Sequence, residues 1–148
     1  MSARTALEDA PLPALVFGAG GLAPFVGLAL LSALNPASVS LLHALESYAA
    51  VILSFVGALH WGYAVHANAQ GRMALIQYGW SVLPALFGWL ALQLPLALAL
   101  RAQALTFIAC YAVDHALAAA EVIPRWFLRL RAALSVIAVV ALVVASYV

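Results

Sequence analysis

The sequence predicts a bundle of five transmembrane helices in a single domain that uses residues 1–148. Of the 148 residues, 68% are hydrophobic and 7% are charged, and the mean hydropathy is +1.11. Soluble domains are roughly half apolar and about a quarter charged, so this chain cannot cover a water-facing surface. Its apolar runs are close to the ~20 residues that cross a bilayer as a helix. They do not alternate with polar residues, which favours helices over a transmembrane β-barrel.

Polar or proline-containing breaks separate the predicted helices. The first ends at Asn35-Pro36, because proline disfavours helix in the residue before it. The second ends at the polar segment that follows His66. Pro95 separates the third helix from the fourth, and Pro124 precedes the fifth. The predicted helices cover residues 12–34, 45–66, 73–93, 97–121 and 126–148.

The arginines predict the orientation. Five spans place most of the six basic residues on one side of the membrane and only Arg101 on the other. The larger group consists of Arg4, Arg72, Arg125, Arg129 and Arg131. Basic residues favour the cytoplasmic side, which predicts an N-in, C-out arrangement. Contact with lipid head groups is the expected role of this group.

The composition also excludes several function classes. A net charge of +1 gives no field that would attract nucleic acid. The single cysteine, Cys110, cannot form an internal disulfide, and no Cys/His cluster suggests a metal site. Hydrolytic and phosphate-binding motifs are missing as well, so we expect no catalytic residues, no cofactor and no enzyme activity. The N-terminal segment resembles neither a signal peptide nor a transit peptide, and with the lysine-free, Ala/Leu-rich composition this predicts the bacterial cytoplasmic (inner) membrane.

Ionisable residues inside the spans are the candidate functional groups, because such groups are costly in lipid unless they find a partner. They are Glu46 near the outer start of the second helix, His60 near its inner end, and the adjacent Asp114 and His115 on the fourth helix. His60 and Asp114 both lie about 10 Å from the inner helix ends. A hydrogen bond between them is therefore possible if the two helices are neighbours, and it would fix the tautomer of the imidazole.

Three interpretations of these residues remain open. The favoured one is structural: His60, Arg129 or Arg131 neutralises Asp114 and holds helices together. The second is proton or ion handling, although Glu46 and His60 are about 21 Å apart along one helix face. The third is haem ligation by His60 and His115. Asp114 and His115 are adjacent on their helix and point about 100° apart, so they cannot both face His60 squarely, which argues against this interpretation.

Small residues predict where helices approach closely. Ser54, Ala58 and Gly62 form an i, i+4, i+8 row on the second helix, which would let another helix come near. The stripe on which Glu46 and His60 lie is a different face, formed by Glu46, Ala50, Leu53, Gly57, His60 and Ala64. In the first helix, glycines at 18, 20 and 21 precede Pro24, and we favour helix packing over a local kink as their role.

Several segments resemble a known family. Residues 48–62, YAAVILSFVGALHWG, match a Y-x3-ILSF-x-G-x2-HWG pattern, and residues 81–89, SVLPALFGW, match S-x-x-P-x-x-x-x-W. Further matches are GAGGLAPF, Asp114 and WFLRLR, so that the resemblance covers nearly the whole chain. The sequence thus resembles the transmembrane protein 69-like family, also called domain of unknown function 3429. The resemblance implies a multi-helix inner-membrane protein without an assigned activity, with motif positions at His60, Trp61, Gly62, Pro84, Trp89, Asp114 and Arg131. Ala58 departs from the pattern, where a glycine is frequent.

The favoured functional hypothesis is a non-enzymatic accessory or assembly component of a membrane complex. Its partners would be the lipid bilayer and other membrane-protein subunits. The alternative is permeation of a small solute or proton through Glu46, His60 and Asp114. Haem binding is the less favoured third hypothesis.

Overall fold

The computed structural model describes residues 10–119 and 123–148, and within these ranges all regular structure is helical. The helices are α1 (Leu12–Gly20), α2 (Ala23–Leu34), α3 (Val39–His66), α4 (Gly71–Ala91), α5 (Leu96–Ala119) and α6 (Arg125–Ala145). Taken together, α1 and α2 are long and apolar enough to cross a membrane, and so are α3, α4, α5 and α6. The predicted all-helical fold with five spans is confirmed.

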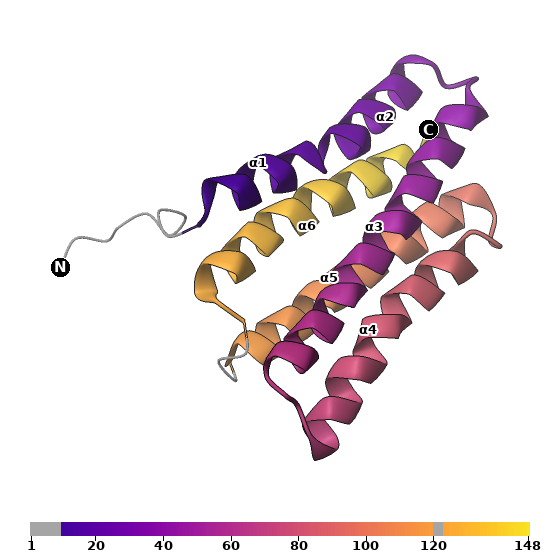
Figure 1. Cartoon of the computed structure of the whole chain (residues 1–148). Helices are drawn as coiled ribbons and strands as arrows, with labels where there is room; N and C mark the ends of the chain where they lie inside the picture. The colour runs from indigo at the N-terminus through magenta and orange to yellow at the C-terminus, as the bar shows by residue number, and fades with distance from the viewer. Residues whose placement is uncertain (1–9, 120–122) are drawn as a thin grey trace.

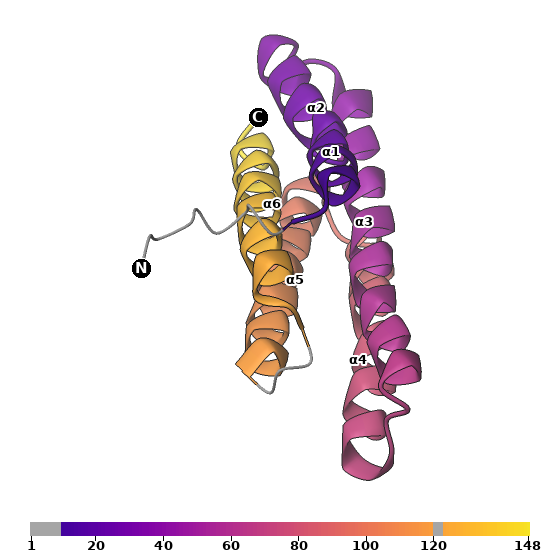
Figure 2. The ribbon, with the colours of Figure 1, turned by 60° about the vertical axis from the view of Figure 1, so that its left-hand side comes forward.

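The helices form an antiparallel bundle around α3 (Figures 1 and 2). Helix α3 packs most extensively against α4 and also contacts α2 and α5, while α5 pairs with α6. The α1–α2 run lies along α6, and α2 also contacts α3. The start of α1, the α3–α4 turn and the start of α6 lie at one end of the bundle, and the α2–α3 turn, the α4–α5 turn and the C-terminus lie at the other.

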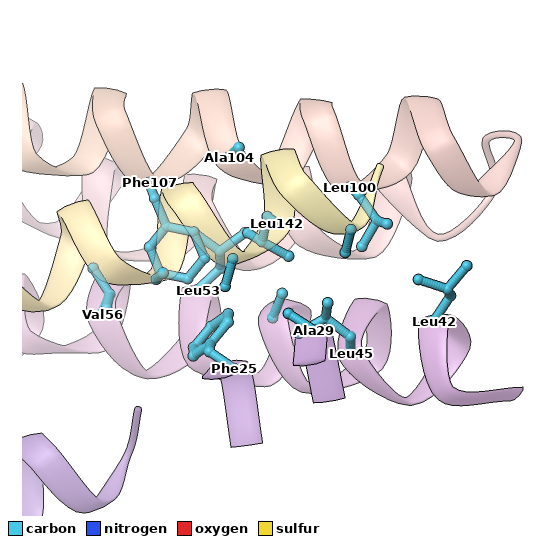
Figure 3. Packing of buried hydrophobic residues seen from close by; sticks show 14 of the residues in the cluster. Phe25, Ala29, Leu42, Leu45, Leu53, Val56, Leu100, Ala104, Phe107 and Leu142 are labelled. Carbon is cyan, nitrogen blue, oxygen red and sulfur yellow. The ribbon is translucent and has the colours of Figure 1, made fainter. Parts of the chain in front are cut away.

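Aromatic rings fill the centre of the apolar core (Figure 3). The ring of Phe25 on α2 packs edge-on against Phe107 on α5, with centroids 5.7 Å apart, and against Tyr48 on α3, at 5.1 Å. Leu53 on α3 and Leu142 on α6 complete the same cluster and are fully buried. The core therefore joins α2, α3, α5 and α6.

The first span is broken, contrary to the continuous helix predicted for residues 12–34. The break lies at Gly21 and Leu22, just before Pro24, which has no backbone N–H to continue the helical ladder. The hydroxyl of Tyr48 donates a hydrogen bond of 2.8 Å to the carbonyl of Gly21 and so stabilises the break. Gly18 does pack closely, because a Cβ there would lie 3.3 Å from Leu134 on α6. The glycines therefore serve both a contact, as predicted and found at Gly18, and a kink at Gly21, which was the less favoured alternative.

The other helix boundaries differ from the prediction mainly at the start of α3. This helix begins at Val39, six residues before the predicted residue 45, and has 28 residues. At 1.5 Å per residue it is about 42 Å long, more than the ~30 Å hydrocarbon core, so the apolar run marks only part of it. Helices α4, α5 and α6 begin within two residues of the prediction. The predicted end of the fourth helix at residue 121 lies outside the described residues.

Arg101, the isolated arginine of the sequence, contacts the C-terminal end of α6. Its Nε donates a hydrogen bond of 3.1 Å to Ser146 Oγ, its Nη2 lies 3.4 Å from the Ser146 carbonyl, and the guanidinium stacks 4.7 Å from the centroid of the Tyr147 ring. A cation at this position interacts favourably with the helix dipole and the free carbonyls. The exception in the charge distribution therefore has a local structural role.

Close packing of α3 and α4 uses a different row of small residues from the predicted one. A Cβ at Gly57 would lie 2.6 Å from the carbonyl oxygen of Ser81, and one at Gly88 would lie 3.2 Å from Ala50 Cα. By contrast, Ser54, Ala58 and Gly62 are exposed, and a Cβ at Gly62 would meet nothing within 4 Å. The prediction that this second row packs within the bundle was wrong, because the helix turns its Glu46–Ala64 stripe inward instead.

Candidate functional site

Three ionisable side chains meet inside the bundle, and we call them the buried triad: His60 on α3, Asp114 on α5 and Arg131 on α6. The Asp114 carboxylate is central. Its Oδ2 accepts a hydrogen bond of 2.9 Å from Arg131 Nε, and its Oδ1 lies 2.9 Å from His60 Nε2. The three residues are 0%, 3% and 6% exposed in the order His60, Asp114 and Arg131. A single carboxylate thus connects three helices.

The helices place these side chains at one depth. His60 lies six residues before the end of α3, and Asp114 five residues before the end of α5. Helix α6 runs in the opposite direction, so Arg131, six residues after its start, comes to the same level. The contact between His60 and Asp114 that the sequence allowed is present, and Arg131 is the arginine that neutralises the carboxylate.

The two contacts of Asp114 differ in kind. Arg131 provides a hydrogen-bonded ion pair, which is the stronger type of polar contact. The ring N–H of His60 is not directed along the short Nε2–Oδ1 line, and neither ring nitrogen makes a hydrogen bond of good geometry. The Asp114–Arg131 ion pair carries no net charge. Mutual neutralisation and burial are the properties of a structural contact in a membrane interior.

Glu46 belongs to a separate contact. It lies two turns inside α3, not at its start, because the helix begins earlier than predicted. Its Oε2 lies 2.9 Å from Nδ1 of the exposed His43, and its backbone carbonyl accepts a hydrogen bond of 3.0 Å from Gln103 on α5. Glu46 and His60 therefore share the buried stripe of α3 but have different partners.

His115 does not join the triad. Its side chain is exposed and its ring packs 6.3 Å from the ring of Tyr111 on the same helix, while the neighbouring Asp114 is buried. His60 is fully buried, so the two histidines do not face a common space and the haem hypothesis loses its ligand pair. Among the described residues, no group of three or more His, Cys, Asp or Glu side chains could hold a metal ion.

The positions of the sequence motifs divide between the interior and the surface of the bundle. His60, Pro84, Asp114 and Arg131 are buried. In contrast, Trp61, Gly62 and Trp89 are exposed, and the Trp61 ring packs edge-on against Tyr78 of α4 with centroids 4.9 Å apart.

Several buried polar side chains were not predicted from the sequence. Gln77, Gln103 and Ser135 are each at least nine-tenths buried. Glutamines within apolar runs were the available signal for the first two residues. Nothing about Ser135 alone distinguished it from serines that face lipid.

Five apolar spans and a buried triad joining three of them define a small polytopic helical membrane protein. The chain belongs to the family described as "Protein of unknown function (DUF3429)", whose family model matches residues 10–147. The resemblance noted from the sequence motifs is thereby confirmed.

Two curated relatives are similar over most of the chain. It is 37% identical to "Transmembrane protein 69" of Xenopus tropicalis over 139 residues, which are 93% of this chain and 55% of the relative. It is 28% identical to "Transmembrane protein 69" of Mus musculus over 144 residues, which are 97% of this chain and 59% of the relative. The chain thus spans less than two thirds of either relative. No solved structure matches it.

Proposed function

We propose that this chain is a non-enzymatic accessory or assembly subunit of a larger membrane complex. The proposal rests on one observation: some of the family motif positions are buried in the bundle and others are exposed on its surface. The buried positions hold the bundle together, whereas Trp61, Gly62 and Trp89 are exposed on its outer surface, although the Trp61 ring also packs against Tyr78 of α4.

The outer face of α3 has the composition of a helix-docking surface. Ser54, Ala58 and Gly62 lie exposed on it beside Trp61. The hydroxyl of Ser54 donates to the carbonyl of Ala50 in its own helix, at 3.0 Å, so it needs no further partner in lipid. Small residues at this spacing let helix backbones approach, which favours association where lipid offers no hydrophobic driving force.

Photo-crosslinking in native membranes tests the proposal. We expect benzoylphenylalanine at Val51, on this face, to give a protein adduct of one defined mass. The same probe at the equally exposed Leu105 of α5 should give only lipid adducts. Gly62→Leu should abolish the adduct and co-purification of the partner, because the side chain blocks backbone approach.

Two results would count against a hetero-complex. An adduct of twice the mass of the chain would assign the face to self-association. An adduct unaffected by Gly62→Leu, or formed equally from Leu105, would remove the α3 face as an interface.

The permeation alternative has less support. It requires water or a chain of polar groups between Glu46 and the triad, which are about 21 Å apart. His60 has no exposed surface, and Glu46 pairs with His43.

We also propose that the protein lies in the bacterial cytoplasmic membrane with its N-terminus inside. Arg72, Arg125 and Arg129 lie at the bundle end where α1 begins, while Arg101 at the other end contacts α6. The arginine distribution supports the orientation with the N-terminus inside. The lysine-free, Ala/Leu-rich composition supports the assignment to the bacterial cytoplasmic membrane.

Cysteine labelling of intact cells tests this orientation. Ala37→Cys, in the α2–α3 turn, should react with an impermeant maleimide from outside, and Ala67→Cys, in the α3–α4 turn, only after permeabilisation. The native Cys110 is buried and serves as the unlabelled background. The reverse pattern would invert the topology.

A further inference from the structure

A cavity of about 310 Å³ lies between the α1–α2 break, α3 and α6, with Phe107 of α5 at its inner wall. Its volume is at the low end of the ~300–1,000 Å³ that is typical of small-molecule sites. Helix α1 forms one wall but contains no buried residue. That wall is therefore the least firmly packed part of the cavity, and it offers a route of entry from the bilayer.

Six aromatic side chains, together with aliphatic ones, line this cavity. They come from α1, α2, α3, α5 and α6, and they are Phe17, Phe25, Phe55, Phe107, Trp126 and Phe127. Aromatic rings pack favourably edge-on or offset against other rings. The six rings offer a planar ligand ring stacking and edge contacts that a flexible acyl chain does not use.

Two polar residues, Arg131 and Ser135, also line the cavity. They are four residues apart on α6 and so lie on the same helix face. Arg131 Nη2 and Ser135 Oγ are both buried without a hydrogen-bond partner, although Arg131 Nε is bonded to Asp114. Unpaired buried donors are unfavourable. Both atoms lie beneath the cavity surface, so a bound acceptor oxygen would stabilise this end of the cavity once the two side chains turn toward it.

The Asp114–Arg131 ion pair favours one kind of acceptor over another. Asp114 already neutralises Arg131, at 2.9 Å. An anionic head group would place a second negative charge near this carboxylate in a medium of low dielectric constant, which is unfavourable. A neutral carbonyl oxygen satisfies the donors without that repulsion.

From the six aromatic side chains, the unpaired donors and the charge-balanced Asp114–Arg131 pair, we propose that this cavity binds a membrane-soluble quinone. One ring carbonyl accepts hydrogen bonds from Arg131 and Ser135, and the ring lies among the aromatic side chains. Binding of this ligand would add to the proposed accessory role and does not depend on it.

Calorimetric titration of the purified full chain in detergent, with a benzoquinone that carries one isoprene unit, tests the proposal. We expect saturable binding and saturable fluorescence quenching that Trp126→Phe removes. Ser135→Ala should weaken binding about three- to tenfold, the effect of one lost hydrogen bond. Thr106→Val is the matched control: its hydroxyl bonds to the carbonyl of Ala102 at 2.9 Å and does not line the cavity, so binding should be unchanged.

Two comparison ligands separate the quinone from other lipids. 2-Methylnaphthalene has planar rings but no carbonyl, and dodecanoate has an anionic head and a flexible chain. We expect both to bind more weakly than the quinone and to be insensitive to Ser135→Ala. Equal binding of methylnaphthalene, tighter binding of dodecanoate, no effect of Ser135→Ala on the quinone, or no saturable quinone binding would each overturn the proposal.

Discussion

Asp114→Asn is expected to lower the free energy of unfolding by about 3–5 kcal/mol, the usual loss when one partner of a buried ion pair is removed. The substitution keeps the size of the side chain but leaves the Arg131 guanidinium without its countercharge, at 6% exposure. Arginine cannot lose its proton in a protein interior, so the charge stays. Thermal and denaturant unfolding in one detergent, followed by circular dichroism, measures the loss.

Further variants test whether the loss of stability in Asp114→Asn comes from the unpaired charge of Arg131. Arg131→Met should cost less than Asp114→Asn, because a carboxyl group, unlike a guanidinium, can become neutral by taking up a proton. The double variant Asp114→Leu/Arg131→Met should cost less than Asp114→Asn alone, since it buries no unpaired charge. Arg72→Ala, at an exposed position, is the control and should change stability by about 0.5 kcal/mol or less. Additive losses in the double variant would show that the two side chains do not stabilise the fold as a pair.

The same arginine links the two features that distinguish the interior of this bundle. Arg131 holds α6 to α5 through Asp114, and it also lines the aromatic cavity next to the broken first span. Nε serves the first contact, while Nη2 is left without a partner. Stability and ligand binding therefore depend on different atoms of one side chain, which is why Ser135, and not Arg131, is the residue to replace in a binding experiment.

Features that the lipid bilayer determines, such as the length of the spans and the pairing of ionisable residues, were predictable from the sequence. Length and hydropathy predict five spans because the bilayer sets the length of each helix. The contact between His60 and Asp114 follows from their similar depth and the high cost of leaving either side chain alone in lipid. The stripe from Glu46 to Ala64 was recognised as one helix face, and all of its residues are buried.

Features that depend on which helices are neighbours were not predictable. The sequence indicates that small residues such as Ser54, Ala58 and Gly62 permit a close helix contact, but it does not show which row of α3 has a neighbouring helix. The row at Ala50 and Gly57 meets α4, because Pro84 and Ser81 lie opposite it. Similarly, the break at Gly21 depends on Tyr48, which is 27 residues further along the chain and reaches the freed carbonyl.

Gly57 is the position where the α3–α4 contact is tightest, and Gly57→Ala is expected to destabilise the protein by about 1–3 kcal/mol through overpacking. The added methyl group would lie 2.6 Å from the Ser81 carbonyl oxygen and 3.2 Å from Pro84 Cδ. Neither neighbour can rotate away, because one is backbone and the other belongs to a closed ring. The two helices must therefore separate along their most extensive contact.

Gly62→Ala is the matched control on the same helix, where a methyl group meets nothing within 4 Å. Alanine favours helix over glycine by up to about 1 kcal/mol, so this variant should be neutral or slightly more stable. Both variants gain the same helix propensity, and the difference in their melting temperatures in one detergent therefore isolates the cost of the close approach. Equal stability of the two would mean that α3 and α4 can separate freely at Gly57. In that case His60, one turn further along α3, would not be held at the depth of Asp114 by this contact.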